Sequence, residues 1–146
     1  MKLLAKMLAL VATKFENVLD KQGQPYFLHC LHVMQTCGLT DENSLCIAVG
    51  HDLVEDTDVT VDYLTREFNF DIAAGIECLT FISSPEYTYE DYIKFIGNLP
   101  KEHKIANIKL ADLRHNMDAS RLRGLTKKDF DRMEKYMKAY IYLKSV

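Results

Sequence analysis

Four ionisable side chains lie inside one otherwise apolar, helix-like segment, residues 48–57. His51 and Asp52 are adjacent, and a second acidic pair, Glu55 and Asp56, follows one helical turn later. Burying a charged group costs several kcal/mol unless the group is paired or binds a metal. This segment can therefore enter a protein core only where other polar groups or a cation meet it.

Suitable partners occur in two other segments that have helical periodicity. His29 precedes the His51-Asp52 pair, and Asp112 follows it in the run Lys-Leu-Ala-Asp, residues 109–112. Two neutral imidazoles and two carboxylates form a mixed nitrogen and oxygen site that suits Mn²⁺, Fe²⁺ or Zn²⁺ better than Ca²⁺. The sequence thus predicts that three helices converge on one divalent metal, with His29, His51, Asp52 and Asp112 as its ligands.

Three further polar side chains share helix faces with these predicted ligands. Glu55 stands four residues after His51, Asp56 four after Asp52, and Asn116 four after Asp112, a spacing that places each pair on one face. A metal with open positions polarises a phosphoryl group and lowers the pKa of bound water, and a nearby carboxylate can orient or deprotonate that water. We therefore expect Glu55 and Asp56 to be catalytic and the neutral Asn116 to contact a phosphorylated substrate.

Apolar residues recur at helical spacing along almost the whole chain, and no segment alternates like a half-buried strand. The pattern predicts an all-α fold with helices near residues 2–19, 26–38, 42–55, 60–68, 70–82, 88–98, 101–122 and 126–144. The first segment loosely imitates a signal peptide, but Lys6 interrupts it and no convincing small-residue cleavage site follows. We interpret it as an amphipathic helix, and we expect residues 1–146 to form a single domain.

Charge, hydropathy and cysteine usage narrow the expected partners. A net charge of −3 with no basic cluster gives no reason to expect a nucleic-acid polymer as partner. No apolar run reaches the roughly 18 residues of a membrane span. The four cysteines show no C-x-x-C spacing, so we expect free thiols and a cytoplasmic protein. The sequence leaves the oligomeric state open.

Three motifs in this chain resemble those of the HD-domain phosphohydrolases, and in particular the hydrolase domain of the RelA/SpoT proteins and their small stand-alone relatives. Residues 23–29 resemble the family's G-x-P-Y-x-x-H, residues 51–57 its H-D-x-x-E-D-T, and residues 109–117 its K-L-A-D-x-x-H-N-M. The similarity extends over residues 10–140 in the family's order and spacing. It implies an HD-domain helical bundle of about eight helices, and we expect the synthetase domain of the long family members to be absent.

The resemblance also implies a cofactor, a reaction and a set of site residues. The metal would be Mn²⁺, with Fe²⁺, Co²⁺ or Zn²⁺ as alternatives, and the substrate a small nucleotide, guanosine tetra- or pentaphosphate, that loses its 3′-pyrophosphate. The implied ligands are His29, His51, Asp52 and Asp112; Glu55 and Asp56 would be catalytic, and Lys21 and Asn116 would contact the substrate.

One departure from the family pattern keeps other substrates open. Long members carry Arg-Lys-x-Gly before the first motif, and that arginine packs on the guanine base, whereas this chain has Asp20 at the position. Lys21 is retained as a candidate phosphate contact. Alternative interpretations are a phosphatase for another nucleotide, such as a deoxynucleoside monophosphate or NADPH, and a nucleotide-binding sensor without turnover.

Overall fold

The computed structural model describes residues 1–100, 103–122 and 125–145. In order, the helices are α1 (Lys2–Lys14), α2 (Phe27–Thr36), α3 (Glu42–Gly50), α4 (Leu53–Asp56), α5 (Val61–Glu67), α6 (Phe70–Leu79), α7 (Tyr89–Gly97), α8 (His103–Asn116), the 3₁₀ helix η1 (Ala119–Arg121) and α9 (Lys127–Lys144). The described residues contain no β-strand beyond one isolated bridge between Leu19 and Pro25. The predicted all-α helical bundle is confirmed.

Polar caps fix where several helices begin. The side chain of Asp41 accepts a hydrogen bond from the backbone N–H of Ser44 at the start of α3, directly after Gly38 with its positive φ of 75°. Thr126 forms a capping box with Asp129 at the start of α9. These local interactions determine where the helices begin, and the apolar faces of the helices determine how they pack.

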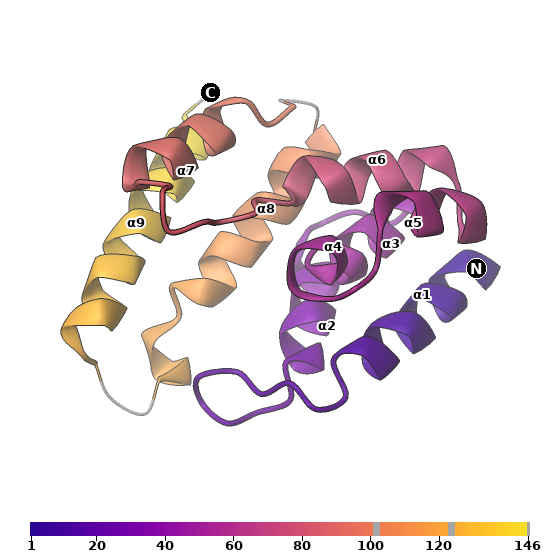
Figure 1. Cartoon of the computed structure of the whole chain (residues 1–146), viewed down its shortest axis with the longest axis horizontal. Coiled ribbons are helices and arrows are strands. Elements are labelled where there is room, and N and C mark those ends of the chain that lie inside the picture. The colour runs from indigo at the N-terminus through magenta and orange to yellow at the C-terminus, as the bar shows by residue number, and fades with distance from the viewer. Residues whose placement is uncertain (101–102, 123–124, 146) are drawn as a thin grey trace.

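Helix α8 occupies the middle of the molecule (Figure 1), with α1 to α4 on one side and the α7–α9 pair on the other. It packs against α2, α6 and α9, while α3 packs against α1, α2 and α6. The largest fully buried side chains of the core are almost all apolar, among them Phe15, Met7, Ile47, Leu53, Leu64, Ile72, Ile76, Ile96, Ile108 and Leu113. His29 belongs to the same fully buried group, which places a polar ring in the core.

Three predicted helices differ clearly from those observed. The expected helix 2–19 ends at Lys14. The expected helix 42–55 is divided into α3 and α4 at His51 and Asp52, and Asp52 has φ −99° and ψ 0°. The expected helix 101–122 ends at Asn116 and is followed by η1; residues 101–102 lie outside the described residues. Across the described ranges, no helix combines the length and apolarity that a bilayer crossing requires.

Candidate metal centre

Three elements bring the four predicted ligands to one buried point. Helix α2 carries His29, the break between α3 and α4 carries His51 and Asp52, and α8 carries Asp112. None of the four is more than 8% exposed. Their assignment as metal ligands remains a prediction, but the convergence expected from the spacing is present in the fold.

The two imidazoles face the two carboxylates through their Nε2 atoms. His29 Nε2 lies 3.2 Å from Asp112 Oδ1 and 3.7 Å from Asp52 Oδ2. His51 Nε2 lies 3.0 Å from Asp52 Oδ2 and 3.6 Å from Asp112 Oδ1. Each nitrogen is therefore close to both carboxylates, as donor atoms around one small cation would be.

The hydrogen bonding of the rings supports this fit. Both Nε2 atoms are buried and have no hydrogen-bond partner among the described residues, whereas both Nδ1 atoms are engaged. Burial alone would lower the pKa of His51, but the carboxylates of Asp52 and Asp112 raise it well above its ordinary value. The cluster thus attracts positive charge to the point where Nε2 and carboxylate oxygens meet, and its donor set fits a divalent cation such as Mn²⁺, Fe²⁺ or Zn²⁺.

Each carboxylate of the cluster is held by side chains that donate hydrogen bonds. Tyr26 Oη donates to Asp52 Oδ2 at 2.6 Å. Lys109 Nζ donates to Asp112 Oδ2 and Asn116 Nδ2 to Asp112 Oδ1, both at 2.8 Å. Burial raises the pKa of Asp112, but the Lys109 ammonium outweighs this and holds it well below the usual range. Both carboxylates are thereby ionised and fixed in direction.

Glu55 and Asp56 line the open side of this cluster. One oxygen from each of Asp52, Glu55 and Asp56 lies within 4.8 Å of the others. Enclosure by the pocket, followed by repulsion from Asp52, raises the pKa of Glu55 to about 7 and that of Asp56 to about 6. The backbone N–H of Phe81 donates to Glu55 Oε1 at 2.7 Å and orients that carboxylate. Both groups are suited to exchanging protons near neutral pH.

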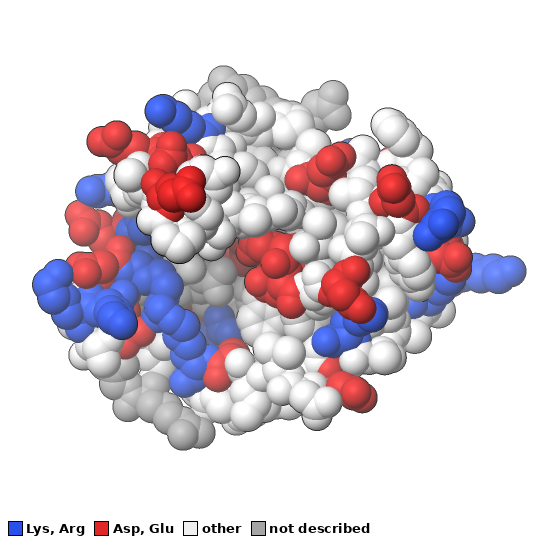
Figure 2. Space-filling model, in the orientation of Figure 1, with Lys and Arg blue, Asp and Glu red and all other residues white. Residues whose placement is uncertain are grey.

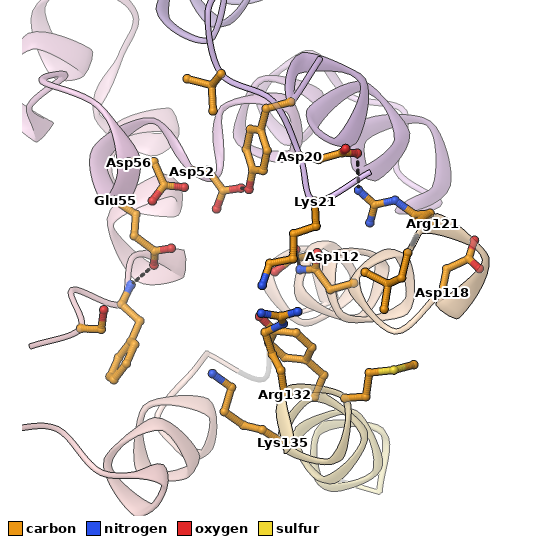
Figure 3. Close-up of a pocket in the computed structure, with 18 of the residues that line it drawn as sticks. Asp20, Lys21, Asp52, Glu55, Asp56, Asp112, Asp118, Arg121, Arg132 and Lys135 are labelled. Atoms are coloured by element: carbon orange, nitrogen blue, oxygen red, sulfur yellow. Dashed lines mark hydrogen bonds and ion pairs between the residues drawn. The ribbon is translucent and has the colours of Figure 1, made fainter. Parts of the chain in front are cut away.

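The cluster opens into a pocket of about 650 Å³ with walls of opposite charge. In the hollow at the centre of Figure 2, acidic side chains lie on one side and Lys and Arg side chains on the other. Figure 3 shows Lys21, Arg132 and Lys135 pointing into the pocket opposite Glu55 and Asp56. A pocket of this size and polarity accommodates a phosphorylated small molecule.

The loop after α1 presents Lys21 to this pocket. Asp20 Oδ1 accepts hydrogen bonds from the backbone N–H groups of Gln22 and Gln24, both at 2.9 Å, and Gly23 takes a positive φ of 80°. Asp20 Oδ2 pairs with Arg121 at 3.2 Å. Asp20, which departs from the family pattern described above, is therefore engaged in an internal ion pair.

Sequence reasoning missed the cationic wall contributed by α9. Arg132, Lys135 and Tyr136 line the pocket, and Lys135 Nζ lies 4.7 Å from the centroid of the Tyr92 ring. Burial, followed by the neighbouring Lys109, lowers the pKa of Lys135. The spacing i, i+3, i+4 places these three residues on one helix face, but only tertiary packing turns that face toward the pocket.

The structure also gives neighbours to histidines whose roles the sequence left open. His115 lies on α8, and its ring is nearly parallel to those of His29 and His32, with centroid distances of 5.0 and 3.8 Å. Burial, followed by the Arg121 guanidinium, lowers the pKa of His115 to about 3. The ring next to His29 is therefore neutral.

Comparisons with known proteins give relatives in sequence and in fold. No family model matches the sequence. The chain is 31% identical over 113 residues to a GTP pyrophosphokinase of Myxococcus xanthus, covering 70% of this chain and 15% of that protein. It is 30% identical over 105 residues to a probable guanosine-3′,5′-bis(diphosphate) 3′-pyrophosphohydrolase of Synechocystis, covering 66% of this chain and 14% of that protein. The chain thus spans about 15% of the length of these relatives.

A solved structure shares the fold over nearly the whole chain. It is that of a metazoan orthologue of SpoT, a protein described as hydrolysing ppGpp and taking part in starvation responses. The TM-score is 0.82 with 23% identity, and the match covers 96% of this chain and 84% of that one. The resemblance to RelA/SpoT proteins expected from the three motifs is confirmed.

Proposed function

We propose that this chain, a relative of the RelA/SpoT proteins in sequence and in fold, is a metal-dependent phosphohydrolase of a small phosphorylated nucleotide. The first substrate to test is guanosine 3′,5′-bis(diphosphate), ppGpp, from which it would remove the 3′-pyrophosphate. The observation that carries the proposal is the buried cluster of two histidines and two aspartates opening into a pocket with one acidic and one cationic wall. The activities named for the sequence relatives and the metazoan SpoT orthologue agree with it.

The metal of this proposal is Mn²⁺, with Fe²⁺, Co²⁺ or Zn²⁺ as alternatives. His29, His51, Asp52 and Asp112 would hold it, because their donor atoms converge and two of them, the Nε2 atoms, lack hydrogen-bond partners. When bound, such an ion would polarise a substrate phosphoryl group and lower the pKa of water. The absence of thiolates from the donor set favours a catalytic over a structural role.

Glu55 and Asp56 are the proton acceptors in this proposal. Their carboxylates lie beside Asp52 at the mouth of the cluster, and their pKa values of about 7 and 6 allow them to take a proton from attacking water near neutral pH. The Phe81 N–H holds Glu55 in a fixed direction. Among the described residues, no backbone N–H donates to the Asp56 carboxylate, which makes Glu55 the better oriented base.

Substrate phosphates would lie against the opposite wall. Lys21 points into the pocket from the α1–α2 loop and Arg132 and Lys135 from α9, so their charges can bind the oxygens of a pyrophosphate group. Asn116 lines the same pocket, and in the structure its amide donates to Asp112. Apolar side chains, among them Leu19 and Met133, complete the lining and offer contact area for a base.

Two further expectations belong to this proposal. Residues 1–146 would act as one catalytic domain, since the proposed site draws on the α1–α2 loop, α4, α8 and α9. The location would be the cytoplasm, which agrees with the free thiols of Cys30, Cys37, Cys46 and Cys78.

A panel assay tests the proposal. The purified protein, loaded in turn with Mn²⁺, Fe²⁺, Co²⁺ and Zn²⁺, is incubated with ppGpp, deoxynucleoside monophosphates and NADPH, and both pyrophosphate and orthophosphate are measured. Pyrophosphate from ppGpp supports the proposal. Orthophosphate from another nucleotide supports the alternative, a phosphatase for a nucleotide other than ppGpp. The Asp20–Arg121 ion pair favours this alternative, because Asp20 stands where the family resemblance implies an arginine that stacks on guanine. Tight ppGpp binding without any product would indicate a sensor.

A further inference from the structure

The two histidines of the cluster are fixed at Nδ1 in different ways. His51 Nδ1 lies 2.8 Å from the backbone carbonyl oxygen of Ala48, which can only accept a hydrogen bond. His29 Nδ1 lies 2.7 Å from Nδ1 of His115, a side-chain atom that can either donate or accept. The protonation pattern of His51 is thus set by the backbone, whereas that of His29 depends on another side chain.

The hydrogen bond between His29 and His115 determines which ring nitrogen carries the proton in each histidine. Two ring nitrogens at 2.7 Å share one hydrogen, because one must donate and the other accept. His29 can offer a lone pair at Nε2 only as the neutral tautomer that carries its proton on Nδ1. His29 Nδ1–H therefore donates, and His115 Nδ1 accepts with its own proton on Nε2.

We propose that His115 is a positioning residue for the metal centre: its unprotonated Nδ1 holds the proton of His29 on Nδ1 and thereby keeps His29 Nε2 free to bind the ion. The inference rests on the proposed function, because it concerns the same cluster. It assigns to His115 a role that the predicted ligand set does not contain, since His115 itself would not touch the metal.

The fold holds His115 in the orientation that this role requires. Its ring is nearly parallel to those of His29 and His32, with interplanar angles of 13° and 16°. Arg121 Nη1 donates to the His115 backbone carbonyl oxygen at 2.7 Å and anchors the end of α8. Asp112 and His115 are three residues apart on α8, so one helical turn supplies both a ligand and the acceptor for the ligand on α2.

Two substitutions at residue 115 distinguish the loss of the hydrogen-bond acceptor from the loss of ring packing. His115→Asn places an oxygen near the position of the lost Nδ1 and can still accept from His29. His115→Leu has a similar shape to asparagine but offers no acceptor. Both variants lose the stacked ring, so a purely structural role predicts equal effects. His32→Leu serves as a control, because it removes a stacked ring that does not contact His29 through a hydrogen bond.

The readout is the affinity of the chelator-treated full chain for Mn²⁺ alone, measured by calorimetry without substrate. We expect one equivalent bound by the wild type and His32→Leu, similar affinity within about threefold for His115→Asn, and roughly 10- to 100-fold weaker binding by His115→Leu. Equal affinities of the Asn and Leu variants would overturn the inference alone. A wild type that binds no divalent ion would overturn the proposed function and the inference with it.

A measurement on the wild type covers the case in which His115→Leu does not fold. Nitrogen-15 NMR of the histidine rings reports which nitrogen carries the proton in each tautomer. In the protein loaded with diamagnetic Zn²⁺, His29 should be protonated at Nδ1 and His115 at Nε2. A proton on His115 Nδ1 would contradict the inference whatever the variants do.

Discussion

Glu55→Gln tests whether the pocket's acidic wall provides the base. Glutamine keeps an oxygen at Oε1, so it can still accept the hydrogen bond from the Phe81 N–H and hold the loop after α6. It cannot accept a proton from water. We therefore expect the fold and the bound metal to be retained while turnover falls by about 10²–10⁴, the usual contribution of a positioned base, or roughly 3–5 kcal/mol of transition-state stabilisation.

The pKa of Glu55 gives the pH dependence of the wild type. With a pKa of about 7, roughly one tenth of Glu55 is ionised at about pH 6 and roughly nine tenths at about pH 8. Activity should rise with pH as Glu55 becomes ionised. A cation bound beside Asp52 favours the ionised form of Glu55 and lowers its pKa, so about 7 is the upper value for the midpoint of this rise. The glutamine variant lacks this group and should keep only a rise with a midpoint at or below about pH 6, from Asp56.

The assay is turnover of ppGpp against pH for the wild type, Glu55→Gln and Asp56→Asn, with metal content measured for each. The Asp56→Asn control tests the second carboxylate at the same distance range from Asp52. If the turnover rate of Glu55→Gln is within tenfold of the wild-type rate, Asp56 alone serves as the base. If it loses its metal together with its activity, Glu55 is a ligand, and the division between ligands and base is wrong.

Three other perturbations follow from the site. Asp52→Ala removes a ligand carboxylate that Tyr26 orients, so it should abolish activity and metal retention; a full equivalent of metal in the purified variant would show that the ligand set is wrong. Lys135→Met should raise the KM for ppGpp about 10- to 100-fold, because it loses a charge-assisted hydrogen bond worth roughly 1.5–3 kcal/mol. The matched variant Lys138→Met, on an exposed part of α9, should leave KM unchanged. Equal KM values in the two variants would show that Lys135 does not bind the substrate phosphates. Metal-free protein should lose stability between about pH 7 and about pH 8 in chemical denaturation, because the folded state raises the pKa values of Glu55 and His51, and such groups contribute stability that is lost as pH rises through the folded pKa. The lowered pKa of His115 has the opposite effect, but only below its ordinary value of 6.5. Stability that increases over that range would contradict the pKa directions.

The sequence predicted which side chains meet, but not how the backbone brings them together. Successive residues of a continuous helix differ by about 100° in direction, so a break at His51 and Asp52 makes it easier for both side chains to face one point. The structure separates α3 from α4 at these two residues, and Asp52 leaves regular helical geometry. An apolar pattern that continues across the break gives no sign of it, because periodicity reports burial rather than chain direction.

The cationic wall was missed for a related reason. Arg and Lys on one face of a C-terminal helix are ordinarily solvated, and nothing local distinguishes Arg132 and Lys135 from Lys138. Their place in the pocket depends on the packing of α9 against α8, a contact between helices that sequence periodicity does not orient. The partners of His29 Nδ1 and Asp52 Oδ2 are likewise long-range contacts, from His115 and Tyr26.

The most direct test of the central claim is a product assay with the Mn²⁺-loaded wild-type chain and ppGpp. The site predicts release of pyrophosphate from the 3′ position, together with loss of that release when the metal is removed by chelation and its return when Mn²⁺ is added back. Absence of any cleavage with Mn²⁺, Fe²⁺, Co²⁺ or Zn²⁺, by protein shown to hold one equivalent of the ion, would contradict the assignment of this cluster and pocket to phosphohydrolysis.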